Sequence, residues 1–82
     1  MLIFWDEPKR LANLAKHGFD FADLDEAFFL SAMVVPVKLG RHMAIGRLEN
    51  GIIAVVFTYL GSEGLSVISM RRANGNERSL LT

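Results

Sequence analysis

The chain has 82 residues, which is enough for one domain built on one hydrophobic core. Its formal net charge is zero, which argues against a strong nonspecific binder of polyanions, and it has no cysteine, which excludes disulfides and thiolate metal sites. Hydrophobic residues make up 51% of the sequence, yet no apolar run reaches the roughly 18 residues of a membrane span. We therefore expect a single-domain cytoplasmic protein over residues 1–82.

The N-terminal half of the chain predicts one short strand followed by two helices. The apolar run Leu2–Trp5 indicates the strand. Apolar residues at helical spacing predict a helix over 7–17, with Asp6 as its N-cap and Gly18 at its end. A second amphipathic helix is expected directly after Asp20, which can cap it.

The C-terminal half reads as a series of strands joined by tight turns. The segment 32–38 is rich in β-branched residues, and the apolar runs 41–48, 52–60 and 65–72 predict strands separated by an Asn50-Gly51 hairpin and a turn at 61–64. A short helix is possible from Asn74 or Asn76 onward. The predicted order is β-α-α-β-β-β-(α). We expect an α+β fold in which two N-terminal helices pack on an antiparallel β-meander.

Charge is distributed unevenly along this electrically neutral chain. Residues 1–37 carry three basic side chains against six acidic ones, whereas residues 38–82 carry six basic against three acidic. The helical half is therefore acidic and the sheet half basic. We expect an anionic ligand to meet the sheet.

Two adjacent arginines, Arg71 and Arg72, end the last predicted strand. Neighbouring side chains on a strand point to opposite faces, so one of them can lie on a solvent-facing sheet surface. The planar guanidinium group matches the oxygens of a phosphodiester, and Glu77 and Arg78 follow closely enough to lie at the same end of the sheet. The alternative is that these arginines are solvated charges at a strand end.

Several blocks of the sequence, spread over nearly its whole length, resemble the BrnT family of small ribonuclease toxins from type II toxin–antitoxin systems. The blocks are Phe4-Trp5-Asp6, Lys9, Asn13, Lys16-His17-Gly18-Phe19-Asp20-Phe21, Met43-Ala44-Ile45-Gly46-Arg47, Ala54-Val55-Val56-Phe57-Thr58, Ile68-Ser69-Met70-Arg71-Arg72-Ala73 and Glu77-Arg78. The resemblance implies a RelE-like fold, RNA cleavage without a metal or cofactor, and a cognate antitoxin of the ribbon–helix–helix type.

RNA cleavage without a metal needs proton transfer and cationic stabilisation of the phosphate. We predict catalytic roles for Arg71, Arg72, Glu77 and His17. Phosphate-binding roles are predicted for Arg47, Arg78 and Lys16. Each residue has a simpler alternative, since Glu77 can pair with an arginine, His17 can cap its helix and Lys16 can be solvated. No acidic or histidine cluster has metal-ligand spacing.

A second function remains open from the sequence. Zero net charge and high apolar content are also typical of a module that holds a partner protein and no longer cleaves RNA. Growth arrest on expression alone would favour the ribonuclease, whereas tight partner binding without growth arrest would favour the binding module.

Overall fold

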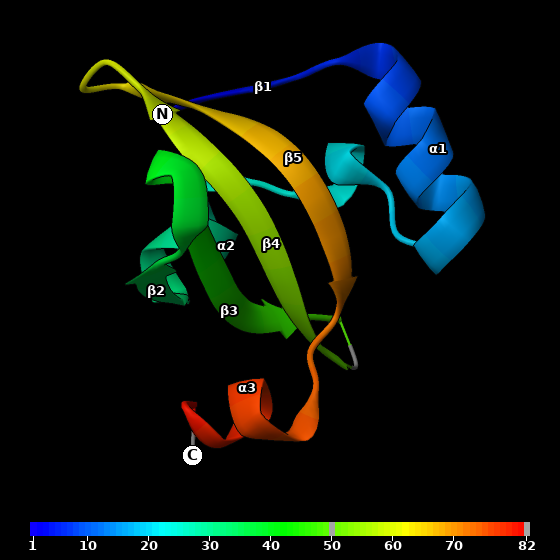
Figure 1. The fold of residues 1–82 in the computed structure, drawn as a ribbon, viewed down its shortest axis with the longest axis vertical. Helices are drawn as coiled ribbons and strands as arrows, with labels where there is room; N and C mark the ends of the chain where they lie inside the picture. The colour runs from blue at the N-terminus through cyan, green and yellow to red at the C-terminus, as the bar shows by residue number, and fades with distance from the viewer. Residues whose placement is uncertain (50, 82) are drawn as a thin grey trace.

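The computed structural model describes residues 1–49 and 51–81, which form one five-stranded sheet with helices packed on one face and at its ends (Figure 1). In chain order the elements are β1 (Leu2–Trp5), α1 (Glu7–His17), the 3-10 helix η1 (Phe21–Asp23), α2 (Glu26–Ser31), β2 (Met33–Pro36), the 3-10 turn η2 (Lys38–Gly40), β3 (His42–Leu48), β4 (Gly51–Leu60), β5 (Gly64–Arg72) and α3 (Gly75–Ser79). Asn50, which the sequence placed in the hairpin between 41–48 and 52–60, lies outside the described residues. No helix of the described residues is long and apolar enough to cross a membrane.

The sheet is mixed, with strand order β1-β5-β4-β3-β2. Strands β2 to β5 form the expected antiparallel meander, but β1 pairs parallel to β5, from Leu2 opposite Gly64 to Trp5 opposite Val67. The expectation of a wholly antiparallel sheet was therefore wrong. It was wrong because the pairing joins segments some 60 residues apart, and no local pattern encodes such a contact. The order of elements predicted from the sequence also omitted β2, which adds a fifth strand beside β3.

Helix α1 forms where the sequence predicted it. Asp6 has the extended backbone of an N-cap residue, although its side chain makes no capping hydrogen bond. Gly18 ends the helix in the left-handed conformation (φ 76°), and its N–H donates to the Leu14 carbonyl at 2.9 Å. A left-handed C′ residue is most easily supplied by glycine, which explains the sharp stop.

The expected second helix is split into two short pieces. Asp20 caps only η1, accepting a hydrogen bond from the Ala22 N–H. Leu24 is then extended, and Asp25 caps α2 by accepting from the Phe28 N–H. Each aspartate caps its own short helix, so the one continuous second helix expected after Asp20 does not form. With the parallel β1, this split means that the RelE-like arrangement of two helices on an antiparallel meander does not match this fold well.

The hydrophobic core lies between α2, η1 and one face of the sheet, and Figure 1 shows α2 behind β3 and β4. Its largest fully buried side chains are Phe21, Phe57, Ile53, Leu65, Met70, Val55 and Val67. A close contact sets the distance between helix and sheet, because a Cβ at Gly46 would lie 2.8 Å from Cε1 of Phe28.

Gly46→Ala is expected to destabilise the fold by roughly 1–3 kcal/mol, because a methyl group there forces Phe28 and the backbone apart. Urea unfolding measures the loss. Gly51→Ala is the matched control, since its new Cβ would meet only the flexible end of Arg72 at 3.2 Å. Replacing Phe28 with Leu in the Gly46→Ala background should restore part of the stability. Equal urea midpoints for the two glycine variants would contradict the proposed clash.

Candidate functional site

The side of the sheet opposite α2 carries no helix across it in Figure 1, and we call it the open face. The strand register gives its residues. They include Phe4, Met33, Met43, Arg47, Val56, Thr58, Ser66, Ser69 and Arg71, together with Ile45 and Ala54, which are buried. A bulge at Ile68 lets both Ser66 and Ser69 face this side, because Val56 pairs with Ser69 while Phe57 pairs with Val67.

The two adjacent arginines lie on opposite faces of the sheet. Arg71 pairs with Ala54 and faces the open side. Arg72 pairs with Ile53 on the core side, and its guanidinium carbon is 5.7 Å from the centre of the Phe19 ring. One phosphate group therefore cannot contact both arginines.

Arg71 and Glu77 form a two-pronged ion pair at the end of the open face. Nη1 of Arg71 donates to Oε1 of Glu77 at 2.7 Å, and Nη2 donates to Oε2 at 2.8 Å. Glu77 is only 8% exposed and also accepts from the Asn74 N–H, while Asn74 accepts from the Glu77 N–H to complete a capping box. The side chain of Arg71 remains 37% exposed. Glu77 thus holds the guanidinium in place while part of it stays open to solvent.

The electrostatics of this pair fix the ionisation of Glu77. The hydrogen bond from Arg71, together with the Asn74 N–H, lowers the pKa of Glu77 although partial burial opposes the shift. The same pair raises the pKa of Arg71. A carboxylate with a lowered pKa is a weak proton acceptor, so this geometry favours an orienting role for Glu77 over that of a general base.

Glu77→Gln is expected to lower stability near neutral pH and to matter little in acid. The lowered pKa of Glu77 in the folded chain means that its stabilisation is complete above its unfolded value of 4.5 and is lost as the pH falls through the folded value. Glutamine keeps the capping box, so the change removes mainly the charge. Urea midpoints of the variant and of the unaltered chain, at about pH 7 and about pH 3, measure the difference in stability at each pH. An equal difference in stability between the two chains at both pH values would contradict this account.

A second group of basic residues lines a groove between α1 and β5, which we call the α1–β5 groove. Its cavity of about 310 Å³ is lined by Lys9, Ala12, Asn13, Lys16, His17, Ile68 and Ser69. The helix residues recur three or four positions apart and so share one side of α1. The groove thus brings Lys16 and His17, two of the predicted site residues, together with Lys9 and Ser69, which the sequence did not single out for a role.

Asn13 joins α1 to the edge of β5. Its Nδ2 donates to the carbonyls of Met70 (2.8 Å) and Phe19 (3.1 Å), and its Oδ1 accepts from the Met70 N–H at 3.1 Å. Strand β1 stops opposite Val67, so no strand reaches Met70 from this side. The amide of Asn13 takes the place of the missing strand and fixes the wall of the α1–β5 groove.

The remaining predicted residues lie further along the sheet end. Arg47 is exposed on the open face, on β3 and two strands away from Arg71. Arg78 lies in α3, and its Nη1 donates to the Ala73 carbonyl at 3.2 Å. Among the described residues, neither Arg47 nor Arg78 forms a hydrogen bond with Arg71.

The acidic side chains near α1 do not face the α1–β5 groove. Nη2 of Arg10 lies 2.6 Å from Oε2 of Glu7, and Nη1 lies 3.0 Å from Oδ2 of Asp20. Hydrogen bonds from Arg10 and Trp5 lower the pKa of Glu7 to about 2. Two of the six acidic side chains of residues 1–37 are therefore paired with Arg10, and α1 presents a basic side to β5. Lys9 and Lys16 of the acidic helical half thus join the basic residues of the sheet half as groups that can meet an anion.

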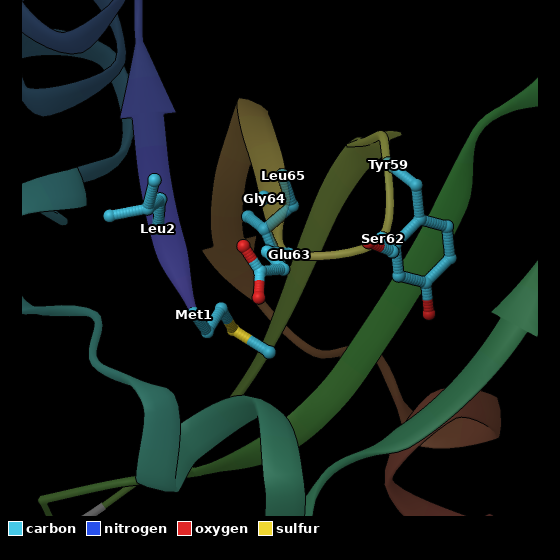
Figure 2. Close-up of a pocket in the computed structure, with 7 residues that line it drawn as sticks. All are labelled: Met1, Leu2, Tyr59, Ser62, Glu63, Gly64 and Leu65. Carbon is cyan, nitrogen blue, oxygen red and sulfur yellow. The ribbon is translucent and has the colours of Figure 1, made fainter.

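Another cavity lies at the far end of the sheet. Figure 2 shows it between the start of β1 and the turn from β4 to β5, and its volume is about 460 Å³. Its lining side chains include Glu63 and Tyr59 but no lysine, arginine or histidine. A nucleic-acid site needs cations, so size alone does not make this cavity the functional site. Within residues 1–49 and 51–81, no group of three or more potential ligands could hold a metal ion.

Fold and geometry together define a small α+β protein with cationic side chains at one end of the sheet and in a groove between α1 and β5. Comparison with known proteins then gives the family. A family model described as the ribonuclease toxin BrnT of type II toxin–antitoxin systems matches residues 5–77. The crystal structure of the Brucella abortus ribonuclease toxin BrnT is 63% identical, with a TM-score of 0.85, over 90% of this chain and 97% of that one. The comparison with curated proteins found no match.

The chain therefore belongs to the BrnT family of ribonuclease toxins of type II toxin–antitoxin systems. The resemblance drawn from the sequence blocks is confirmed, and so is the ribonuclease function expected from it. RNA is the substrate and an antitoxin protein is the partner. The family match does not assign the individual site residues.

Proposed function

We propose that this toxin cleaves RNA without a metal ion, at a centre on the open face built around the Arg71–Glu77 pair. The observation that carries the proposal is the partly exposed guanidinium of Arg71, held by two hydrogen bonds of 2.7 and 2.8 Å. A cation that is already oriented stabilises charge that develops on a phosphate without reorganising during the reaction.

The chemistry assigns three tasks. The 2′-hydroxyl must lose a proton, the phosphorus must carry extra negative charge, and the 5′-oxygen must gain a proton as it leaves. Arg71 stabilises the charge on the phosphate, and Glu77 keeps Arg71 in position. His17 is the proposed proton-transfer group, because the two ring nitrogens of an imidazole can donate and accept a proton.

The other basic residues are assigned to the RNA backbone. Lys16 lines the α1–β5 groove beside His17, and Arg47 supplies a cation to the same open face as Arg71. Arg78, in the last turn of α3, is a further phosphate ligand. A catalytic role for Arg72 stays a prediction, and it would have to act from the opposite side of the sheet.

The cognate antitoxin is proposed to be a ribbon–helix–helix protein, as the resemblance implies. A neighbouring reading frame that encodes such a protein would support this proposal. Co-purification of the two chains and loss of RNA cleavage in the complex test it. A complex that still cleaves RNA at the rate of the free toxin would contradict it.

His17→Ala is expected to slow RNA cleavage by about 10²-fold if the imidazole transfers a proton. The assay follows cleavage of RNA by the purified chain in excess EDTA. Lys38→Ala is the matched control, because Lys38 lies in η2 and lines neither the α1–β5 groove nor the open face. Equal rates for His17→Ala and Lys38→Ala would remove the role of His17.

The same assay separates the ribonuclease from the alternative binding module. Cleavage by the unaltered chain in EDTA supports metal-independent catalysis. Cleavage that appears only after a divalent metal is added would overturn metal independence. No cleavage under either condition, together with a tight antitoxin complex, would favour a module that binds its partner without cutting RNA.

A further inference from the structure

The α1–β5 groove is lined by basic side chains that make no ion pair with any described residue. Lys9, Lys16 and His17 line it, and no acidic side chain does. Among the described residues, none of these three has an ion-pair partner. Basic side chains left unpaired on one side of a neutral chain raise the local concentration of anions there.

The reason for the missing partners lies in the contacts of Arg10. Arg10 binds both Glu7 and Asp20, with nitrogen–oxygen distances of 2.6 to 3.1 Å, and Asp6, the N-cap of α1, does not line the groove. Arg10 follows Lys9 directly, so it points about 100° around the helix from the side that lines the α1–β5 groove. The fold thus pairs both acids with an arginine outside the groove and leaves the two lysines free.

The spacing of the lysines suits an extended polyanion better than a small anion. Lys9 and Lys16 are seven residues apart, which is roughly 10 Å along the helix axis. One phosphate cannot contact both at once, whereas successive phosphates of a chain can. Ala12 and Ile68 add apolar surface to the same lining, which a sugar or base can cover.

The groove also leads toward the proposed cleavage centre. Ser69 lines the groove and lies on the open face, two residues before Arg71 on the same strand. Two residues along a strand span roughly 7 Å. An RNA strand lying in the groove would therefore pass the hydroxyl of Ser69 and reach Arg71 within about one or two nucleotides.

We infer that the α1–β5 groove is a phosphate-binding subsite for single-stranded RNA, in which Lys9 and Lys16 contact different backbone phosphates and Ser69 donates to the strand on its way to Arg71. This inference rests on the proposed function, since it places the substrate of that same centre. It adds Lys9 and Ser69 to the residues that touch RNA.

Binding of an RNA analogue that cannot be cleaved tests the inference. The probe is a fluorescent 2′-O-methyl oligonucleotide, which keeps every phosphate but has no free 2′-hydroxyl. Lys9→Ala is expected to weaken binding several-fold and to reduce the slope of log K against log salt concentration by about 0.7, the value for one contact to single-stranded nucleic acid. Lys38→Ala, on the exposed turn η2, should leave both quantities unchanged.

The outcomes are distinguishable from those of the cleavage assay. Unchanged affinity and slope in Lys9→Ala, or no binding of the probe by the unaltered chain at low salt, would overturn the inference while leaving cleavage of ordinary RNA to stand. Loss of binding in Lys9→Ala by a chain that cleaves no RNA would keep the subsite and remove the proposed function. Equal sensitivity to Lys9→Ala with a duplex probe would overturn the single-stranded assignment.

Discussion

Arg71→Ala is expected to lower RNA cleavage by about 10²–10³-fold, the effect of removing one oriented group that stabilises transition-state charge. The side chain is held by Glu77 at 2.7 and 2.8 Å and keeps an exposed part for the substrate. Arg71→Lys should recover only part of the activity, because a lysine ammonium keeps the charge but lacks the two-pronged geometry. Cleavage rates measured in EDTA give both effects.

The Arg71→Ala variant also leaves Glu77 buried without its partner, which by itself costs roughly 1–3 kcal/mol of stability. The double variant Arg71→Ala/Glu77→Ala removes both charges and separates activity from folding. Arg41→Ala is a control for the loss of one arginine outside the site. A folded double variant that cleaves RNA like the unaltered chain would exclude Arg71 from catalysis. A larger loss in Arg72→Ala than in Arg71→Ala would move the centre to the other side of the sheet.

Asn13→Ala is expected to destabilise the fold by about 3 kcal/mol, because it leaves buried backbone groups of β5 without hydrogen-bond partners. Asn13 makes three such bonds, two to Met70 and one to Phe19. For a domain of this size the loss corresponds to a fall in Tm of more than about 10 °C. Thermal unfolding followed by circular dichroism measures it.

Two comparisons locate the effect of Asn13. Asn76→Ala changes an exposed asparagine in α3 and should alter stability by less than about 0.5 kcal/mol. Asn13→Asp keeps the size of the side chain but cannot donate to either carbonyl, so it should be at least as unstable as Asn13→Ala. Hydrogen exchange of the Met70 amide should accelerate in both Asn13 variants. Unchanged exchange would show that Asn13 does not hold this edge.

Much of the local structure could be predicted from the sequence. Gly18 ends α1, the strands β3 to β5 lie close to the predicted runs, and α3 starts at the Asn74 cap. The opposite directions of Arg71 and Arg72 follow from strand alternation alone. Each of these features depends on residues close together in the chain, so a local pattern contains the necessary information.

The site was less predictable because its residues come from different elements that only the fold brings together. Glu77 was expected as a possible base, yet its contact with Arg71 lowers its pKa and favours an orienting role. Lys9 and Ser69 appeared in the blocks that resemble the BrnT family, but the sequence predicted no role for either of them. The spacing of Lys9, Asn13 and Lys16 on one side of a helix was the available signal, but it does not tell which strand that side meets.

The sequence by itself determined the family, the α+β class, the caps and turns, and the basic residue types that RNA chemistry needs. Only the tertiary structure decided that β1 runs parallel to β5, that Arg10 pairs with both Glu7 and Asp20, and that the lysines of α1 face β5. The physical reason is sequence separation. Caps and turns are stabilised by neighbours in the chain, whereas contacts such as that between Asn13 and Met70, 57 residues apart, exist only once the chain has folded.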